Sequence, residues 1–370
     1  MTTAAAAFTS CPTAARVAAL TAALYAVLVA LVVLTQPQGV LAFAHIGTYF
    51  SEGDPNGTVG YDGQFAYFIA RDGAAAAPLI DGATLRFQRI LYPVAARALA
   101  LGRADAVPWA LVLLNVAAHG LACGLLAALI RQLGGQPWSA LVYTLWIGAI
   151  FALRFNLHEI LCAALALGAV TAYAHGRWRW AVALLILATA AKELGLLAAL
   201  GLGLHAALTR GRWRWAALLV GGPTLYFLIW WGVMRLWFGR LPLGYPAAKL
   251  HVLPFEGMFS VLYDPLQFGM LLLWLGLPTA ALLAAALRAW RRLGRLTLST
   301  ALLLPTAGFV VAMPDVSWQD PVAAYRVAIL IVPMGLLFVA EHAPERWRLL
   351  AALWMPTALV AFLIPGLWAA

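Results

Sequence analysis

Acidic side chains gather in the first stretch of this chain that is not strongly apolar, residues 36–106. The stretch contains Glu52, Asp54, Asp62, Asp72 and Asp81. Asp62 lies in the phrase Gly-Tyr-Asp-Gly-Gln-Phe at 60–65, just before a predicted helix through 66–72. A carboxylate held there can act as a general base on a hydroxyl, or it can cap the helix. Both roles stay open for Asp62, whereas Asp72 and Asp81 flank an Ala-rich stretch and favour turn or cap roles.

Three arginines follow in the phrase Arg-Phe-Gln-Arg-Ile-Leu-Tyr-Pro at 86–93 and its continuation: Arg86, Arg89 and Arg97. On one helix they would project within about 80° of one another, although Pro93 argues against a single straight helix. Arginine binds phosphate through two parallel hydrogen bonds, and a helix at a membrane surface also extends arginines toward lipid headgroups. The pattern therefore predicts contact with the phosphate of a substrate or of a membrane lipid.

Further ionisable residues interrupt strongly apolar segments, namely Arg154, His158, Glu159, Lys192, Glu193 and Arg326. Placing a charged group inside a membrane segment costs free energy, and ionisable residues found there usually belong to a functional site. The alternative is mutual neutralisation, such as Lys192 with Glu159 or Glu193, and such a pair can still line a site. These groups predict a site in which a lipid phosphate meets Arg89, Lys192 or Arg326.

The elements that carry these residues are membrane helices. Of the 370 residues, 64% are apolar and 10% are charged, whereas soluble domains contain roughly 45–50% and about 25%. The composition predicts an all-α, polytopic integral membrane helix bundle that forms a single membrane domain, 1–370. The first outer loop, 36–106, is expected to be partly helical, and a second outer loop covers 235–265. At roughly 20 residues a span, we predict about eleven spans, at 15–35, 107–130, 138–154, 156–174, 178–191, 194–209, 214–234, 266–288, 296–313, 321–340 and 347–368.

Residues 178–209 can form one long span or two short helices that meet at Lys192 and Glu193. One span would move the arginines at 210, 212 and 214 to the outer side and invert every later connection. Two helices preserve the charge pattern, but the 14 residues of the first rise only about 21 Å, less than the roughly 30 Å hydrocarbon core. We therefore predict a turn below the outer surface, in a recess lined by protein or water.

The net charge of +10 does not indicate nucleic acid, because the basic residues form short clusters between apolar runs. With a cytoplasmic N-terminus, 13 basic residues fall inside and 11 outside, while 12 of the 14 acidic residues fall outside. The three cysteines are scattered, and no two histidines lie three or four residues apart, so neither a disulfide framework nor a histidine metal site is expected. Because most acidic residues fall on the outer side, the site formed by these ionisable residues is predicted to face outside.

The sequence resembles the type-C glycosyltransferases, polytopic enzymes that use polyprenyl-phosphate sugars and have an acidic first outer loop. The resemblance rests on residues 61–65 and 86–93 and on the turn at 192–193. It is narrower for a group of bacterial membrane proteins associated with cell-surface glycopolymer formation. It implies an enzyme of the bacterial cytoplasmic membrane, surrounded by membrane lipids, that moves a sugar with inversion from a polyprenyl-phosphate donor to a glycolipid or glycan acceptor.

The resemblance also implies roles for residues of this chain. Asp62 is the expected base, with Asp54 as its competitor because Glu52-Gly53-Asp54 is the nearest approach to a tight acidic pair after the first span. No cofactor is expected to be required, although Glu52, Asp54 and Asp62 have the oxygen ligands that suit one Mg²⁺ or Mn²⁺ ion. Substrate contacts are expected from Gln64, Arg86, Arg89, Tyr92, His158, Glu159, Lys192, Glu193 and Arg326.

Two other functions stay open, a flippase or transporter of a lipid-linked sugar and a noncatalytic scaffold of a polymer-assembly complex. A transporter is expected to show internal repeats, with interrupted helices at matching positions in two halves. The sequence shows no internal repeat and one interrupted pair, at 191–194, and its polar residues gather on the outer side. The sequence therefore favours an enzyme.

Overall fold

The described part of the protein, residues 12–245 and 249–363 of a computed structural model, is helical. Its α-helices are α2 (Pro12–Thr35), α3 (Thr48–Ser51), α4 (Gly63–Asp72), α5 (Ala83–Phe87), α6 (Leu91–Leu99), α7 (Val107–Gln132), α8 (Leu141–Thr144), α9 (Ile147–Arg154), α10 (Glu159–Ala174), α11 (Trp178–Ala191), α12 (Gly195–Leu208), α13 (Trp213–Phe238), α14 (Pro265–Leu271), α15 (Leu277–Leu293), α16 (Leu298–Val311), α17 (Asp315–Gln319), α18 (Pro321–Val327), α19 (Ile331–His342), α20 (Trp347–Trp354) and α21 (Thr357–Leu363). The 3-10 turns are η1 (Gly39–Ala44), η2 (Gly73–Leu79), η3 (Ala104–Ala106), η4 (Pro137–Ala140), η5 (Pro242–Gly244), η7 (Glu256–Val261) and η9 (Pro344–Arg346), and η8 (Leu272–Gly276) is a π-helical turn. These residues form no β-sheet, and a single isolated bridge joins Ile46 to Gly60.

Several helices are long and apolar enough to cross a membrane. Four qualify by themselves, Pro12–Thr35, Ala104–Gln132, Trp213–Phe238 and Pro265–Leu293. Two bent pairs raise the number to six if each pair is one span: Pro137–Thr144 with Ile147–Arg154, bent by 51°, and Pro321–Val327 with Ile331–His342, bent by 44°. Four further apolar helices, α10, α11, α12 and α16, are shorter. The all-helical membrane architecture is thus present, with four to six candidate spans.

The predicted count of about eleven spans is not confirmed, although each predicted segment contains helix in the described residues. Residues 364–368 of the last segment lie outside the described residues. The predicted break in 178–209 is confirmed, because α11 ends at Ala191 and α12 begins at Gly195. The second loop begins later than predicted, because α13 continues to Phe238 and ends at Gly239, whose φ of 72° is the left-handed conformation that commonly closes a helix.

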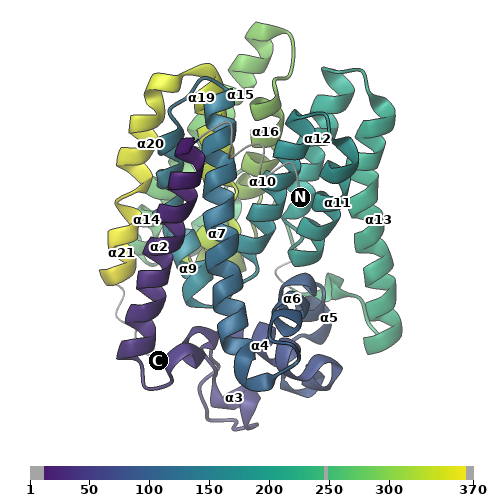
Figure 1. Ribbon diagram of the computed structural model, residues 1–370, viewed down its shortest axis with the longest axis vertical. Coiled ribbons are helices and arrows are strands. Elements are labelled where there is room, and N and C mark those ends of the chain that lie inside the picture. The colour runs from purple at the N-terminus through teal and green to yellow at the C-terminus, as the bar shows by residue number, and fades with distance from the viewer. Residues whose placement is uncertain (1–11, 246–248, 364–370) are drawn as a thin grey trace.

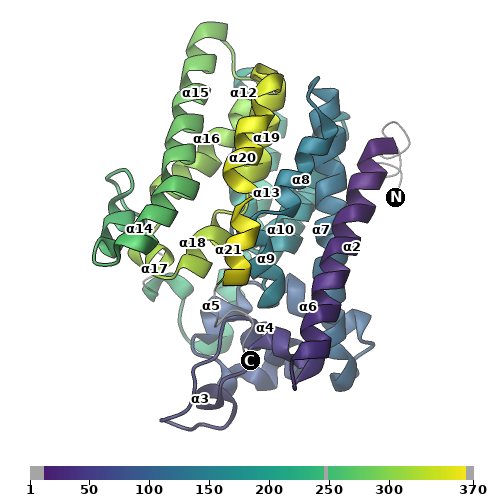
Figure 2. The same ribbon diagram turned by 90° about the vertical axis from the view of Figure 1, so that its left-hand side faces the viewer.

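The helices run along the long axis of the molecule, and the first loop folds across one end (Figures 1 and 2). α7 packs against α2 and α10, while α12 packs against α11, α13 and α16. The first loop has its own small apolar core, in which Phe65, Phe68 and Phe87 are buried. This core makes residues 36–106 a folded cap on the bundle, partly helical as predicted.

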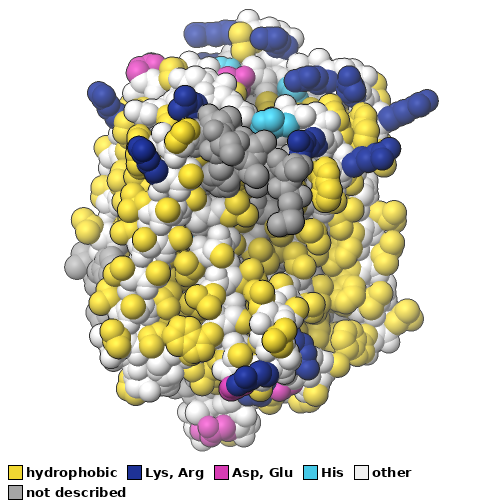
Figure 3. Space-filling model, in the orientation of Figure 1, with side chains coloured by type: hydrophobic (Ala, Val, Ile, Leu, Met, Phe, Trp, Pro, Cys, Tyr) yellow, Lys and Arg dark blue, Asp and Glu magenta, His cyan; other side chains and the backbone are white. Residues whose placement is uncertain are grey.

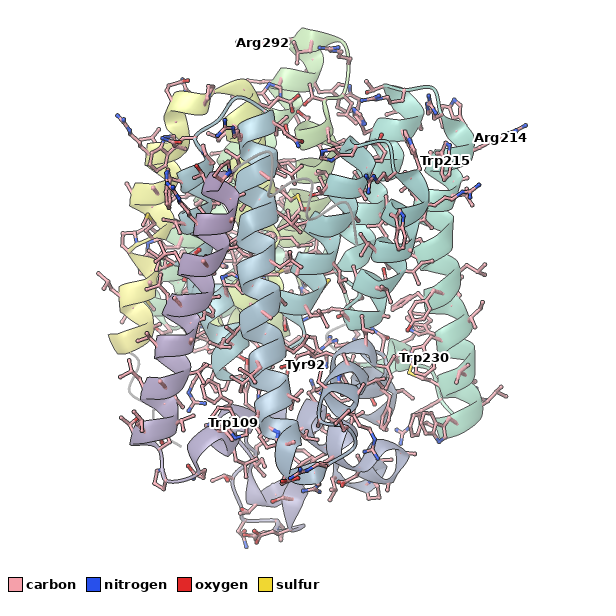
Figure 4. The ribbon with its side chains drawn as sticks, viewed as in Figure 1. Tyr92, Trp109, Arg214, Trp215, Trp230 and Arg292 are labelled. Atoms are coloured by element: carbon pink, nitrogen blue, oxygen red, sulfur yellow. The ribbon has the colours of Figure 1, made fainter. Side chains whose placement is uncertain are left out.

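Charged side chains are distributed unevenly along this axis. An apolar band covers the middle of the molecule, and Lys and Arg side chains gather at the end away from the first loop (Figure 3). Arg214 and Arg292 lie at that end, whereas Tyr92 and Trp230 lie in the half that carries the first loop (Figure 4). Arg214 and Arg292, which belong to two of the basic clusters between predicted spans, therefore lie at the same end of the bundle.

Candidate functional site

The site begins at Asp62, where the first loop enters α4. Gly63 lies so close to the turn after α9 that a Cβ atom there would sit 1.8 Å from the carbonyl oxygen of Phe155. This close approach, which glycine alone permits, brings Asp62 against the ends of the bundle helices. Its carboxylate makes no capping hydrogen bond to α4. Instead it lies 2.9 Å from Arg86 Nη2 and 2.5 Å from Arg326 Nη2.

Arg326 of α18 joins Asp62 to a second carboxylate deeper in the bundle. Its Nη1 lies 2.7 Å from Oε1 of Glu159, the first residue of α10. The same oxygen accepts a hydrogen bond from the ammonium of Lys192. Glu159 is fully buried, and the Lys192 side chain is 2% exposed. Buried charges of this kind are retained only when they are paired and hydrogen-bonded.

The turn between α11 and α12 holds a third carboxylate, Glu193. Arg89 binds it through two hydrogen bonds, Nη2 to Oε1 at 2.7 Å and Nε to Oε2 at 3.1 Å. Gln88 donates to Oε2 at 3.2 Å, and the indole N–H of Trp231 donates to Gln88 Oε1 at 2.8 Å. Gln88 of the first loop thus contacts both the turn between α11 and α12 and helix α13.

These side chains line one cavity of about 490 Å³. One part of its wall is polar and consists of Asp62, Arg86, Arg89, Lys192, Glu193, Ser317, Asp320 and Arg326, together with Gln88. The other part is apolar and includes Leu194, Phe227, Trp231, Leu243, Leu250, Phe309, Val316 and Val327. The cavity therefore offers both charged and apolar contacts to a ligand.

The two arginines keep Asp62 ionised. Burial would raise the pKa of this carboxyl group, but Arg86 and Arg326 lower it well below its usual value. Arg86 also forms two hydrogen bonds to Asp81, at 2.8 and 2.7 Å. Burial would lower the pKa of Arg86, yet Asp62 and Asp81 raise it above its usual value. Both groups therefore stay charged over the whole physiological range.

Four of the predicted substrate contacts, Gln64, Tyr92, His158 and Glu159, do not line the cavity. Gln64 is fully buried and holds the loop, with its amide N–H donating to the carbonyl oxygen of Val59 at 2.7 Å. The hydroxyl of Tyr92 donates to the carbonyl oxygen of Leu111 at 2.9 Å. His158 is buried, with its ring 5.2 Å from that of Tyr92. Gln64, Tyr92 and His158 therefore pack or hydrogen-bond outside the cavity. Glu159 also lies outside it and forms ion pairs with Arg326 and Lys192, which do line the cavity.

Asp54 and Glu52 lie away from the cavity, on an exposed turn between α3 and α4. Asp54 Oδ1 accepts a hydrogen bond from the backbone N–H of Asn56 at 2.9 Å. Within residues 12–245 and 249–363, no three His, Cys, Asp or Glu side chains are placed to hold a metal ion. The ion site considered for Glu52, Asp54 and Asp62 is therefore not formed, because the exposed turn carries the first two away from the third.

The predicted arginine stripe is also wrong in part. α5 ends at Phe87 and α6 begins at Leu91, so Arg86 and Arg97 lie on different helices. Arg97 donates to the carbonyl oxygens of Ala70 and Arg71, at 3.0 and 2.6 Å, and so braces the end of α4. The turn between the two helices leaves Arg86 and Arg89 at the cavity.

Several residues have a part in the site that the sequence does not predict. Asp320 lines the cavity and accepts a hydrogen bond from the hydroxyl of Tyr61 at 2.6 Å. Asp81 was assigned a turn or cap role, yet it is an ion-pair partner of Arg86. Gln88 and Trp231 contribute through tertiary contacts alone. The phrase Asp-Pro at 320–321, at the start of a predicted span, was the one local signal for Asp320.

Comparisons of the chain with protein-family models, curated proteins and solved structures found no match. What the cavity does is therefore inferred from its own residues and from the sequence.

Proposed function

We propose that this protein is a membrane glycosyltransferase that takes a sugar from a polyprenyl-phosphate donor and passes it to a glycolipid or surface glycopolymer acceptor. The observation that carries the proposal is one cavity that joins four cationic side chains to an apolar wall. The cations are Arg86, Arg89, Lys192 and Arg326. Such a cavity suits a ligand with a phosphate at one end and a hydrocarbon chain at the other.

The fixed positions of the lining cations support this ligand. Arg86, Arg89, Lys192 and Arg326 line the cavity and are held in place by carboxylates, of which Asp62 and Glu193 also line it while Asp81 and Glu159 do not. A lipid phosphodiester carries one negative charge and gains a second when its bond to the sugar breaks. Cationic groups already fixed by carboxylates stabilise that new charge without reorganising during the reaction.

The apolar wall suggests where the lipid chain lies. Phe227 on α13 and Phe309 on α16 both line the cavity, and both helices pack against α12. We propose that the polyprenyl chain lies between α13 and α16, with the phosphate at the arginines and the sugar toward Asp62 and Asp320. The acceptor then approaches from the side of the first loop.

The proposed location is the outer face of a bacterial cytoplasmic membrane. Support comes from the arginine-rich end of the bundle, because basic residues favour the cytoplasmic side. The cavity, which the first loop helps to line, then faces outside. Eleven spans, with α10, α11, α12 and α16 as short crossing or partly crossing helices, remain part of this proposal.

We propose no required cofactor, since four protein cations are available to the donor phosphate. The role of Asp62 as the base, which the family resemblance implies, stays a prediction. Its carboxylate is engaged by two guanidinium groups, so it must exchange these partners before it can accept a proton.

One observation favours the transport alternative. The two bent helix pairs, 137–154 and 321–342, lie in different halves of the chain, and α9 of the first pair packs against α18 of the second. Interrupted helices in two halves are typical of secondary transporters. A flippase for the same lipid-linked sugar is therefore the second candidate.

Purified protein in lipid nanodiscs distinguishes these functions. The probes are farnesyl phosphate, uncharged farnesol, and farnesyl-phosphate-linked mannose, glucose and galactose. We expect the phosphates but not farnesol to raise the Tm, and one sugar donor to be cleaved to farnesyl phosphate. Binding without cleavage, together with movement of the donor across proteoliposomes, would establish the flippase. Absence of any binding would reject both functions and leave the scaffold.

A further inference from the structure

Three carboxylates line the cavity, and they differ in their partners. Asp62 is paired with Arg86 and Arg326, and Glu193 is paired with Arg89. Asp320 lines the same wall, but within the described residues no cationic side chain lies within salt-bridge distance of it. Its carboxylate is thus the one of the three that forms no salt bridge, and the charge of Arg326 acts on it only from a longer distance.

Asp320 is nevertheless fixed in position. Its Oδ1 accepts the backbone N–H of Val322 at 2.9 Å, which caps α18, and its Oδ2 accepts the hydroxyl of Tyr61 at 2.6 Å. The ring of Tyr61 lies under Arg326, 5.4 Å from the guanidinium carbon, and packs against Phe155 at 4.5 Å. Each carboxylate oxygen accepts one of these hydrogen bonds and keeps a further lone pair.

Tyr61 remains a hydrogen-bond donor in this arrangement. Burial raises the pKa of Tyr61 well above its usual value, although Arg326 opposes the shift. The phenol therefore keeps its proton and holds the Asp320 carboxylate beside the pair formed by Asp62 and Arg326.

A general base needs a lone pair that is available to the acceptor hydroxyl. Asp62 would have to leave two guanidinium groups first, whereas Asp320 needs to leave none. We infer that Asp320 is the general base of the transfer and that Asp62 is a positioning residue that holds Arg86 and Arg326 for the phosphate. This inference rests on the proposed glycosyltransferase function and departs from the role that the family resemblance implies for the first loop.

The transfer forms one bond at the anomeric carbon and breaks another. The acceptor oxygen forms a bond to the anomeric carbon of the sugar, and its proton passes to Asp320. The bond between the anomeric carbon and the phosphate oxygen breaks, and the electron pair leaves with the lipid phosphate. The phosphate then carries one more negative charge, which Arg86, Arg89, Lys192 and Arg326 surround.

The test compares Asp320→Asn with two matched variants. Asparagine caps a helix as well as aspartate does. Its single amide oxygen can keep the hydrogen bond from the Val322 N–H while its amide N–H donates to the hydroxyl oxygen of Tyr61, so α18 is expected to fold. Asp62→Asn removes the proposed positioning charge. Asp264→Asn is the control, because Asp264 also caps a helix, α14, by accepting the N–H of Gln267 at 3.0 Å, but does not line the cavity.

Cleavage of farnesyl-phosphate-linked sugars is measured in nanodiscs with water, ethanol and 2,2,2-trifluoroethanol as acceptors. We expect Asp320→Asn to bind farnesyl phosphate as the wild type does but to lose about 10²- to 10⁴-fold in turnover. Its rate should recover in part with trifluoroethanol, whose more acidic hydroxyl needs less help from a base. Asp62→Asn should instead weaken binding of farnesyl phosphate, and Asp264→Asn should change neither quantity.

Turnover of Asp320→Asn within a few-fold of wild type overturns the inference while the proposed function stands. The same holds if Asp320→Asn loses turnover without recovery by the acidic alcohol and Asp62→Asn shows that recovery instead, because Asp62 is then the base. A wild-type protein that cleaves none of the donors with any of these acceptors overturns both the function and the inference.

Discussion

The guanidinium of Arg326 lies 2.5 Å from the carboxylate of Asp62, although 264 residues separate the two in the sequence. Its other nitrogen lies 2.7 Å from Glu159. One arginine thus fastens the first loop to the interior of the bundle. Both residues line the cavity, so the ion pair that attaches the first loop to the bundle also fixes the positions of two side chains of the site.

Removing this arginine should destabilise the protein. Arg326→Ala leaves the buried Glu159 and the half-buried Asp62 with one partner fewer each, and breaking a buried ion pair costs about 3–5 kcal/mol. We expect a clear drop in Tm in nanodiscs. Arg103→Ala is the control, because Arg103 pairs with Asp105 at the surface, both 70% exposed, and such pairs contribute about 0–1 kcal/mol. Equal effects of the two variants would contradict the structural role of Arg326.

The stability contributed by Asp62 should depend on pH in one direction. Because Arg86 and Arg326 outweigh burial and lower its pKa, Asp62 stabilises the fold above its unfolded-state pKa of about 3.9. This contribution is lost as the pH falls through the lower folded-state pKa. The difference in Tm between wild type and Asp62→Asn should therefore stay constant from about pH 5 to 8 and shrink below about pH 4. A difference that has already vanished at pH 6 would refute the assignment of these ion pairs.

Arg89 and Lys192 should govern affinity for the lipid phosphate. A hydrogen bond to a charged group contributes about 1.5–3 kcal/mol, so Arg89→Ala or Lys192→Ala should weaken binding of farnesyl phosphate by about 10- to 100-fold. Binding of farnesol provides the comparison, since it lacks the phosphate. Unchanged affinity in both variants would remove these residues from the phosphate site.

Gly63 should not tolerate a side chain. Gly63→Ala places a Cβ atom 1.8 Å from the Phe155 carbonyl oxygen, so α4 must shift, and overpacking of this kind costs about 1–3 kcal/mol. The shift also moves Asp62, and we expect a lower Tm together with weaker binding of farnesyl phosphate. Gly221→Ala in α13 is the control, because nothing lies within 4 Å of its added Cβ. A stable Gly63→Ala variant with wild-type affinity would show that the close approach is unimportant.

Glu52 and Asp54 should be dispensable for turnover. Both are exposed on the turn between α3 and α4, away from the cavity. The double variant Glu52→Gln, Asp54→Asn should cleave farnesyl-phosphate sugars at the wild-type rate, both with and without EDTA. A loss of rate confined to this variant, restored by Mg²⁺ or Mn²⁺, would support the ion site considered from the sequence.

The sequence by itself determined which segments are helical and where one of them breaks. Helical hydrogen bonds are local, and a long apolar run has no other way to satisfy its backbone in lipid, so the segments can be read from composition. The break at Lys192 followed from the same logic, because an unbroken span would have reversed the later charge clusters. Six of the predicted site residues, Asp62, Arg86, Arg89, Lys192, Glu193 and Arg326, meet at one cavity for a related reason: ionisable side chains in an apolar chain must find one another.

The tertiary structure alone decided which carboxylate meets which cation. Asp62 and Asp320 both occupy positions just before helices, and nothing in their local sequence says that the first is held by two arginines and the second by a tyrosine. Those partners arrive from α5 and α18 for Asp62 and from the first loop for Asp320, and an ion pair depends on a few ångströms of separation between segments far apart in the chain. The same long-range packing places Trp231 in contact with Gln88 at the cavity, whereas Gln64 is buried in the first loop, where it donates to the carbonyl oxygen of Val59.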